Sequence, residues 1–405
     1  MNTSFYIAKR YLFSRKSTHA INIISGISML GVFVGSAALV IILSVFNGFE
    51  SVIVTMYNNF TPQLKIEPKQ GKTFNSNTAY FNGLHKNKTL SSYTEVLEEH
   101  ALVKYGGKQM ISTIKGVSDE FLNNATLDST IQKGSFTLKK NNQPYAVVGA
   151  IVEGNLGVNV QDGLTALQIY SPTRGSSNDL IPLDEFKTRY IYPSGVFSIQ
   201  QDFDDMVITP LSFARDLLDQ PVNVSSIELN FKPGTNVDAV QNDIKSKLDT
   251  RFTVKNRYEQ NTELYKILHL EKASTYLILT FILMIAIFNI VGSLTMLVMD
   301  KQKDIAILTG LGATARTIQG IFFFEGMLIT MIGCITGMFV GLIFSLAQQY
   351  FQMIKMGGML NAYPVEIKIN DFLLVFLTVT VIGCIASGIS ARLSLKGLAD
   401  IKQDL

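Results

Sequence analysis

The chain consists of long apolar runs without charge and one long polar stretch. The first run extends from Ile21 to Phe49, 29 residues without a charged side chain, and Glu50 ends it. A helix needs about 20 apolar residues to cross a bilayer, and three further runs of that kind follow the polar stretch. The pattern predicts a membrane α-helical protein with four transmembrane helices, over 21–49, 273–299, 318–347 and 372–390.

The spacing of these runs is one helix, a large insertion and then three helices. Segment 50–272 mixes the period-two alternation of strands with helical patterns. A helix is predicted after Pro233-Gly234, with Thr235 and Asp238 as its capping box. Runs typical of strands lie at Leu64–Ile66, Tyr145–Ile151, Ala166–Tyr170, Ile227–Phe231 and Phe252–Val254. We therefore predict a compact α+β extracytoplasmic domain between the first and second transmembrane helices.

Lysine and arginine gather beside some helix ends and not others. The 348–371 loop has only Lys355 and Lys368. The basic residues of the other flanks are Lys9, Arg10, Arg15 and Lys16 in the leader, Lys301, Lys303 and Arg316 in the 300–317 loop, and Arg392, Lys396 and Lys402 in the 391–405 tail. Because basic flanks stay in the cytoplasm, both termini are predicted inside and segment 50–272 outside.

The leader, residues 1–20, itself shows helical spacing. Phe5, Ala8 and Leu12 fall on one face, and Lys9 and Arg10 lie largely elsewhere. We predict a cytoplasmic amphipathic helix that lies on the inner membrane surface with its apolar face down. A disordered basic leader is the alternative.

Charge and chemistry exclude several classes of function. Segment 50–272 holds 23 Lys and Arg against 25 Asp and Glu, so it lacks the basic face that nucleic acids require. The four histidines are scattered without metal-ligand spacing. Gly71-Lys72-Thr73 imitates the end of a phosphate-binding loop, but Ile66 stands where that motif needs glycine. We expect no enzyme and no cofactor; ATP would have to be bound by a separate subunit.

Small residues recur four positions apart in the predicted helices. They are Gly31 and Gly35; Gly333, Gly337 and Gly341; and Gly383 and Ser387. Such spacing lets helix backbones approach closely. The partner helix belongs either to the same four-helix unit or to a second copy of the chain.

Several motifs resemble those of the LolC/LolE lipoprotein-releasing permeases, a branch of the MacB/FtsX-like permease superfamily. They cover Ile24–Val32, Ser44–Glu50, the pair Glu271-Lys272, Lys301–Leu308, Gly310–Thr314 and Phe322–Gly326. With the one-plus-three layout, the resemblance spans essentially the whole chain. The tail departs from the family: it keeps Ala391-Arg392 but has no proline around it.

The resemblance implies the subunit of an inner-membrane ABC transporter. Two permease chains, the same or paralogous, would work with a cytoplasmic LolD-like ATPase dimer. The complex would extract lipoproteins from the membrane and pass them to a periplasmic LolA-like carrier. Two alternatives remain open: a MacB-like efflux permease, and an FtsX-like transmembrane regulator of a cell-wall hydrolase.

Three groups of candidate residues follow. The 300–317 loop would contact the ATPase through Lys303, Asp304, Leu311, Gly312 and Arg316. Methionine and phenylalanine adapt to irregular apolar ligands, so the acyl chains of a lipoprotein would contact Met29, Phe33, Phe46, Phe49, Phe281, Met284 and Phe288, each of which could also simply pack or face lipid. The Ser171–Asp184 stretch is predicted as a projecting loop that docks the carrier through Arg174, Leu180 and Ile181, with a plain surface loop as the alternative.

Overall fold

A computed structural model describes residues 3–13, 19–124, 126–172, 186–199, 203–357 and 362–401. The chain divides into two compact units, and the division falls within two long helices. Unit 1 comprises Met1–Val52 and Lys266–Leu405, and unit 2 comprises Ile53–Tyr265. Each unit is described separately below.

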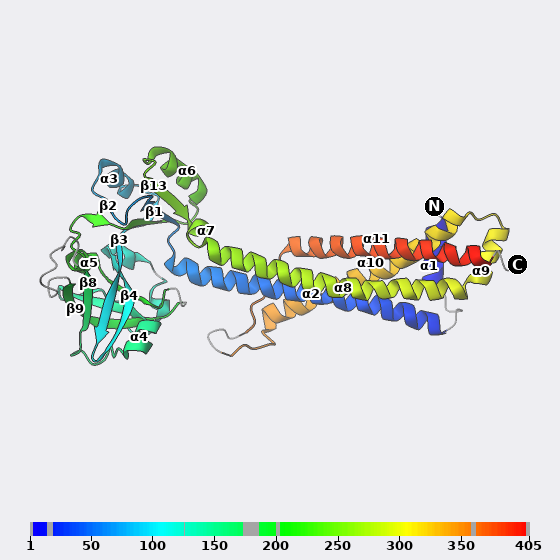
Figure 1. Ribbon diagram of the computed structural model, residues 1–405, viewed down its shortest axis with the longest axis horizontal. Helices are drawn as coiled ribbons and strands as arrows, with labels where there is room; N and C mark the ends of the chain where they lie inside the picture. Colours follow the sequence, from blue (N-terminus) through cyan, green and yellow to red (C-terminus); the bar gives the residue numbers. More distant parts are fainter. Residues whose placement is uncertain are drawn as a thin grey trace, which may run out of the picture. The chain divides into compact units, whose positions relative to one another are not determined.

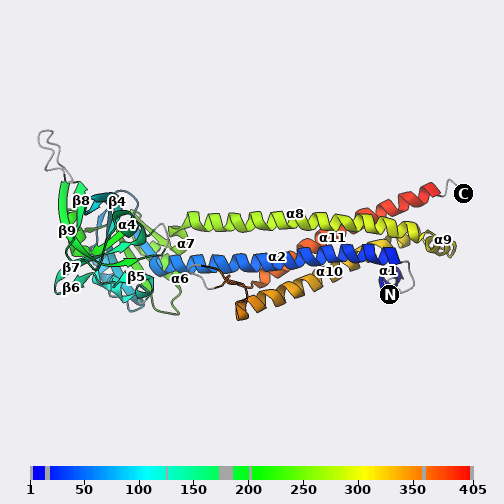
Figure 2. The ribbon, with the colours of Figure 1, turned by 90° about the horizontal axis from the view of Figure 1, so that it is seen from below.

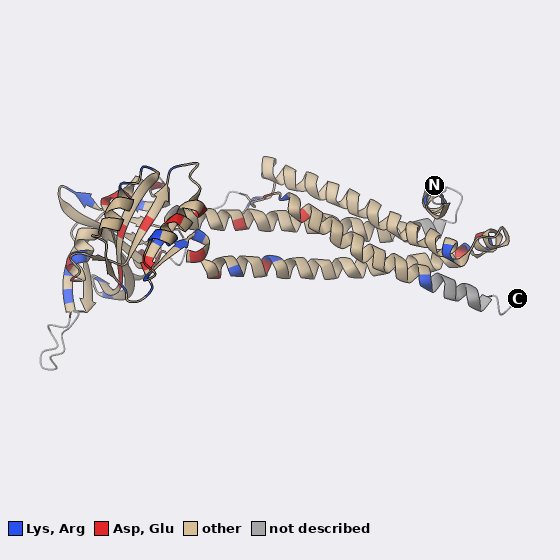
Figure 3. Cartoon of the chain, turned by 90° about the horizontal axis from the view of Figure 1, so that it is seen from above, with Lys and Arg blue, Asp and Glu red and all other residues tan. Residues whose placement is uncertain are grey.

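Unit 1 is helical (Figure 1). Its helices are α1 (Thr3–Phe13), α2 (His19–Phe60), α8 (Thr262–Asp300), α9 (Gln302–Gly310), α10 (Ala315–Phe351) and α11 (Ile369–Ile401). Within the described residues, four helices are long and apolar enough to cross a membrane: Ile23–Asn58, Thr262–Asp300, Ala315–Phe351 and Ile369–Arg392. This confirms the predicted one-plus-three layout. Lys, Arg, Asp and Glu are sparse along these helices and gather near their ends (Figure 3).

Helices α2 and α8 run side by side in both ribbon views (Figures 1 and 2). Small residues allow this, because a Cβ placed on Gly31 would already touch Ala286 at 3.4 Å. The three glycines of α10 face α2 in the same way: a Cβ on Gly333 would stand 2.8 Å from the backbone oxygen of Met29, and one on Gly341 3.0 Å from that of Ala37. The small residues therefore pack helices within one four-helix unit, the first of the two predicted alternatives.

Unit 2 is built on a large mixed sheet. Within the described residues the sheet has 11 strands, in the order β13-β1-β12-β3-β4-β10-β7-β9-β5, with β6 paired to β7 and β8 paired to β3 and β9. These strands are β1 (Leu64–Pro68), β3 (Leu90–Tyr105), β4 (Lys108–Val117), β5 (Ile131–Gly134), β6 (Lys139–Lys140), β7 (Gln143–Gly149), β8 (Leu167–Pro172), β9 (Phe186–Phe197), β10 (Met206–Pro210), β12 (Ser226–Phe231) and β13 (Phe252–Asn256).

Short elements complete unit 2. Strands β2 (Phe74–Asn75) and β11 (Asn223–Val224) form a separate pair. The helices are α3 (Ala79–His85), α4 (Ala150–Leu156), α5 (Leu211–Leu217), α6 (Val237–Lys247) and α7 (Arg257–Gln260), with 3₁₀ turns η1 (Asp119–Asn123) and η2 (Asp128–Thr130). The predicted α+β domain is confirmed.

Two local predictions need correction. The strand predicted to reach Ile151 ends at Gly149, and α4 begins at Ala150; a side chain on Gly149 would overlap the backbone of Asp204. The predicted capping box of Thr235 and Asp238 is wrong, because Asn236 caps α6 and accepts a hydrogen bond from the Ala239 amide at 3.1 Å. Asparagine is as good an N-cap as threonine, and it lies one residue closer to the helix.

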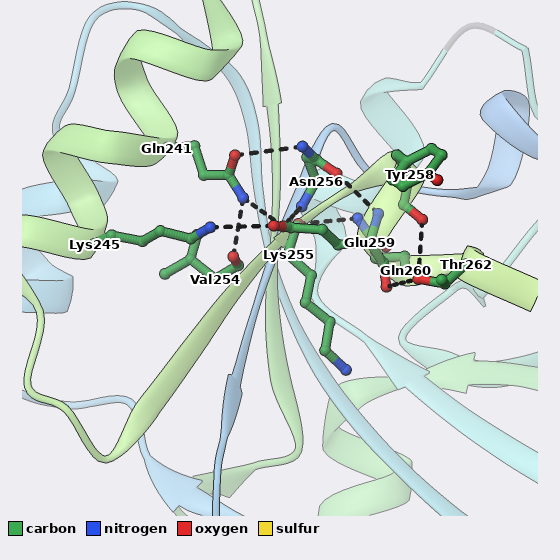
Figure 4. A network of polar contacts seen from close by, with 9 residues as sticks. All are labelled: Gln241, Lys245, Val254, Lys255, Asn256, Tyr258, Glu259, Gln260 and Thr262. Carbon is green, nitrogen blue, oxygen red and sulfur yellow. Dashed lines mark hydrogen bonds and ion pairs between the residues drawn. The ribbon is translucent and has the colours of Figure 1, made fainter. Parts of the chain in front are cut away.

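A polar network fixes the start of α7 to α6 (Figure 4). Asn256 and Glu259 form a capping box, which satisfies two free amides of the first turn. Gln241 of α6 donates to Glu259 at 2.6 Å and to the Val254 oxygen at 3.0 Å. Gln260 donates to the oxygens of Lys255 and Pro62, at 3.2 and 3.0 Å. The network therefore joins α6, β13 and the segment after α2 into one piece of unit 2.

Candidate functional site

The α8–α9–α10 corner holds the residues predicted to contact an ATPase. Helix α9 is anchored by buried Ile305. The corner turns at Gly312, whose φ of +94° favours glycine, and Thr314 caps α10 by accepting from the Thr317 amide at 3.4 Å. The structure thus brings a short helix and a tight turn together at one end of unit 1.

The side chains of this corner point largely to the surface. Lys303 and Arg316 are exposed, Asp304 is half-buried, and Leu311 is 80% exposed. A single exposed apolar side chain is normal at a protein surface, so the exposure of Leu311 leaves it accessible without marking a contact. The five predicted coupling residues therefore lie on one short segment. Among the described residues, this segment is largely exposed.

Two further residues belong to this corner and were not among the predicted contact residues, Tyr11 and Lys301. Lys301 lies over the ring of Tyr11, with its ammonium 5.6 Å from the ring centroid, and 3.7 Å from the Asp304 carboxylate. Burial raises the pKa of the Tyr11 phenol, and the carboxylates of Asp304 and Glu325 raise it further. Lys301, two residues before the predicted Lys303, is thus the lysine held in place, by Tyr11 of the leader helix and by Asp304.

The leader packs along α10. Ser4 donates to the Thr317 oxygen at 3.1 Å, and the Phe5 and Phe324 rings meet edge to face at 5.7 Å. Ala8, on the predicted apolar face, is buried. Helix α1 is therefore a part of the corner, and an amphipathic pattern in the sequence could not distinguish a helix partner from a membrane surface.

The seven residues predicted to contact acyl chains fall on two different surfaces. On α8, Phe281 and Phe288 are 59% and 53% exposed, and Met284 is half-buried. On α2, the four predicted residues are all half-buried: Met29, Phe33, Phe46 and Phe49. Of the seven, the phenylalanines of α8 are therefore the most exposed.

Phe49 lies at the opposite end of unit 1 from α9. Its ring meets that of Tyr363 edge to face at 5.9 Å. Beside it, the buried Asn47 side chain bonds to residues of α8 and α11. Both Asn47 and Lys272 belong to motifs of the sequence, but their contact was not predicted.

The predicted carrier-docking residues Arg174, Leu180 and Ile181 lie outside the described residues. Their flanks are described: β8 and β9 pair antiparallel up to Pro172 and Phe186. On β9, the exposed aromatic residues are Phe186, Tyr190 and Tyr192. Because their spacing is even, they lie on one face of the strand.

Comparison with known proteins places this arrangement in a family. Residues 25–247 match the model of the MacB-like periplasmic core domain, and residues 276–397 match that of the FtsX-like permease C-terminal region. The chain therefore belongs to the FtsX-like permeases that carry a MacB-like periplasmic core domain.

Within that family the chain is similar to lipoprotein-releasing permeases. It is 27% identical over 360 residues to the lipoprotein-releasing system transmembrane protein LolE of Haemophilus influenzae, covering 85% of this chain and 83% of that protein. It is 24% identical over 403 residues to LolC of Neisseria meningitidis, covering 95% and 93%. These findings confirm the predicted resemblance to LolC and LolE.

Among solved structures, the periplasmic region of MacB from Actinobacillus actinomycetemcomitans aligns with a TM-score of 0.36 and 14% identity. The alignment covers 50% of this chain and 91% of that one.

Proposed function

We propose that this chain is the permease subunit of an ABC transporter that extracts lipoproteins from the inner membrane and passes them to a periplasmic carrier. The supporting observation is the similarity to LolC and LolE along most of both chains, joined to a four-span membrane unit with one inserted domain. In this proposal both termini are cytoplasmic and unit 2 is periplasmic, as the basic flanks predict.

The physical problem is the removal of acyl chains from a bilayer. Each buried CH₂ contributes about 0.8 kcal/mol, so a triacylated protein stays anchored unless work is done on it. Extraction therefore needs an energy source and an apolar surface that receives the chains. The exposed aromatic face of α8, with Phe281 and Phe288, is the best candidate for that surface, and the half-buried residues of α2 would join it only where a second permease chain completes the cavity.

The energy would come from a separate cytoplasmic ATPase dimer. In the proposal, Lys303, Asp304, Leu311, Gly312 and Arg316 dock on it. Leu311 supplies apolar contact and the three charged side chains supply orientation, because polar rims around apolar anchors are usual at interfaces. The carrier would dock on the loop with Arg174, Leu180 and Ile181, next to the exposed aromatic stripe of β9.

Reconstitution tests the function directly. The complex that co-purifies with this chain is placed in proteoliposomes with a triacylated lipoprotein, and a soluble LolA-like carrier is added outside. We expect the lipoprotein to appear in the soluble fraction only with hydrolysable ATP. ATP-driven export of small molecules or peptides without lipoprotein release would contradict the proposal and favour the efflux alternative.

Photo-crosslinking tests the surface. A crosslinker at Phe281 should capture the lipoprotein, and trapping the ATPase with vanadate should reduce this capture. A crosslinker at Leu377, which is 60% exposed and lies on α11, is the control. Equal capture at both positions, unchanged by vanadate, would show that α8 contacts only bulk lipid.

A further inference from the structure

Asn47 is the centre of a polar cluster that joins three membrane-spanning helices. Its side-chain amide donates to the Asp371 carboxylate of α11 at 2.6 Å, and its oxygen accepts from the Lys272 ammonium of α8 at 2.7 Å. Lys272 and Asp371 also pair directly at 3.3 Å. Asn47 is 0% exposed. A buried amide with every partner in place fixes the relative position of the groups around it.

The same amide also holds an extended segment, residues 362–368, against α2. Asn47 donates to the Glu366 oxygen at 3.2 Å, and the Glu366 amide donates to the Ser44 oxygen at 2.9 Å. Lys368 pairs with Glu50 at 3.3 Å. A Cβ on Gly48 would overlap the Pro364 backbone, so glycine is needed for the segment to lie this close.

Helix α10 is tied to the same segment by Gln348. Its amide donates to the oxygens of Ile354 and Tyr363, at 3.0 and 3.3 Å, and its oxygen accepts from the Ile354 amide at 2.8 Å. Gln348 is buried. All four spans therefore meet at one polar layer, which we call the Asn47 brace: Asn47, Gly48, Glu50, Lys272, Gln348, Asp371 and segment 362–368.

The brace lies at the far end of unit 1 from α9. We propose that Asn47 and its partners are positioning residues for transport: they make the far ends of α2, α8, α10 and α11 move as one body. A displacement of α9 caused by the ATPase would then move the opposite ends of all four spans together, because the helices cannot shift relative to one another there. This inference rests on the proposed function, and it assigns a role to the motifs around Asn47 and Glu271-Lys272.

A charge swap tests the brace. Lys272→Asp and Asp371→Lys are made singly and together in the full complex. Each single variant should lower the lipoprotein released per ATP hydrolysed about fivefold, which is the size of effect typical of broken coupling networks. The double variant should recover part of it, because the exchanged charges can still pair directly, whereas an Asn47 amide turned over to face them gives up its bond to the Glu366 backbone oxygen. A purely structural role would reduce hydrolysis and release in proportion and leave their ratio unchanged.

A crosslink between Glu50 and Lys368 tests whether segment 362–368 stays fixed to α2 during transport or has to move. Glu50→Cys and Lys368→Cys are combined with Cys334→Ala and Cys384→Ala, so that only the new pair reacts. Without a crosslinker the release per ATP should fall, and a short bis-maleimide should restore it. If the crosslinked complex instead releases even less lipoprotein per ATP than the uncrosslinked double-cysteine variant, the brace is wrong. Segment 362–368 would then have to move away from α2 during transport.

These outcomes are distinct from failure of the proposed function itself. If the parent complex releases no lipoprotein but hydrolyses ATP, the proposed substrate is wrong. The brace is then tested without lipoprotein, by the spread of distances between spin labels on the far ends of α2 and α11, which should broaden in the single swaps and narrow again in the double. Equal distance distributions in all variants would contradict the brace.

Discussion

Gly337 of α10 lies directly against the backbone oxygen of Phe33 on α2, so that any Cβ at this position would overlap it. This contact is the tightest of three along the same seam. Helices that approach this closely gain packing contacts along their length, because dispersion attraction falls off steeply with distance. The Phe33 backbone is consequently held by α10, and its side chain is half-buried.

Gly337→Ala should lower the thermal stability of unit 1. Overpacking costs about 1–3 kcal/mol, which outweighs the gain of about 1 kcal/mol that alanine usually brings in a helix. Gly292→Ala on α8 is the matched control, since its Cβ would meet nothing within 4 Å. The chain has no tryptophan, so helical circular dichroism in detergent gives the midpoint. Equal midpoints of thermal unfolding in the two variants would contradict the close contact between α2 and α10 at Gly337.

Leu311→Asp should weaken binding of the ATPase while the chain inserts and folds normally. The side chain is 80% exposed, so the change removes little from the fold, whereas a central apolar contact at an interface is worth at least about 1 kcal/mol. Affinity is measured on complexes in nanodiscs. Leu164→Asp, an equally exposed leucine in unit 2, should leave it unchanged. Normal affinity in the Leu311 variant would remove α9 from the interface.

The apolar runs predicted the number and order of the spans because bilayer thickness sets their length. They could not give the helix ends: α2 continues to Phe60 and α8 begins at Thr262, since polar residues outside a membrane still form helix. In unit 2, strand patterns, several of them with period-two alternation, located the five predicted strands, although the one predicted to reach Ile151 ends at Gly149. The strand order was beyond reach, because β12 and β3 pair across more than a hundred residues of sequence.

The sites were harder to predict than the fold. Lys303 was chosen by its loop, but Lys301 is the residue in contact with Tyr11. Asn47 meets partners 225 and 324 residues away in the sequence. In a membrane helix every face is apolar, so no pattern tells which phenylalanines are covered. The structure shows those of α2 half-buried and those of α8 exposed.

Lys115→Met should destabilise unit 2 severely. The Lys115 ammonium pairs with Glu228 at 2.7 Å and with Glu98 at 3.5 Å, and both Lys115 and Glu228 are buried. Removing one member of a buried pair leaves an uncompensated charge and costs about 3–5 kcal/mol. Lys115→Met combined with Glu228→Leu should recover part of the loss, because Glu98 then keeps only Lys65 as a nearby cation.

The control for this pair is Lys133→Met. Lys133 pairs with Glu153 at 2.8 Å, but its side chain is mostly exposed, and exposed pairs contribute about 0–1 kcal/mol. Urea unfolding of the full chain, followed by a probe in unit 2, compares the variants. Similar losses of unfolding free energy for Lys115→Met and Lys133→Met would show that Lys115, Glu98 and Glu228 are accessible to water.

The same cluster predicts a pH dependence. Burial by itself would raise the pKa of Glu98, but Lys115 and Lys65 overcome it and hold the pKa below the usual 4.5. A lowered pKa gives stability that is present above the unfolded value and is lost as the pH falls through the folded value. Glu98→Gln should therefore cost stability at pH 7, and the difference from the parent should shrink below about pH 4.5. A constant difference down to pH 2 would contradict the shift.

Loss of the loop between β8 and β9 should abolish binding of a LolA-like carrier. The strands pair in register as far as Pro172 and Phe186, so the two ends of this segment belong to neighbouring strands. Deleting residues 176–179 shortens this connection without changing the register of the strands. A carrier that receives acyl chains has to dock firmly, because any gap would expose them to water.

Arg174→Glu tests the same contact through charge alone. The reversal should reduce pull-down of the carrier about tenfold or more, the loss expected for a charged contact that becomes repulsive. Lipoprotein binding and basal ATP hydrolysis should stay intact, since neither uses this loop. Lys139→Glu, a reversal at the exposed strand β6, is the control that changes the net charge of unit 2 equally. If the deletion and Arg174→Glu both retain full carrier binding, the docking surface must be sought elsewhere in unit 2.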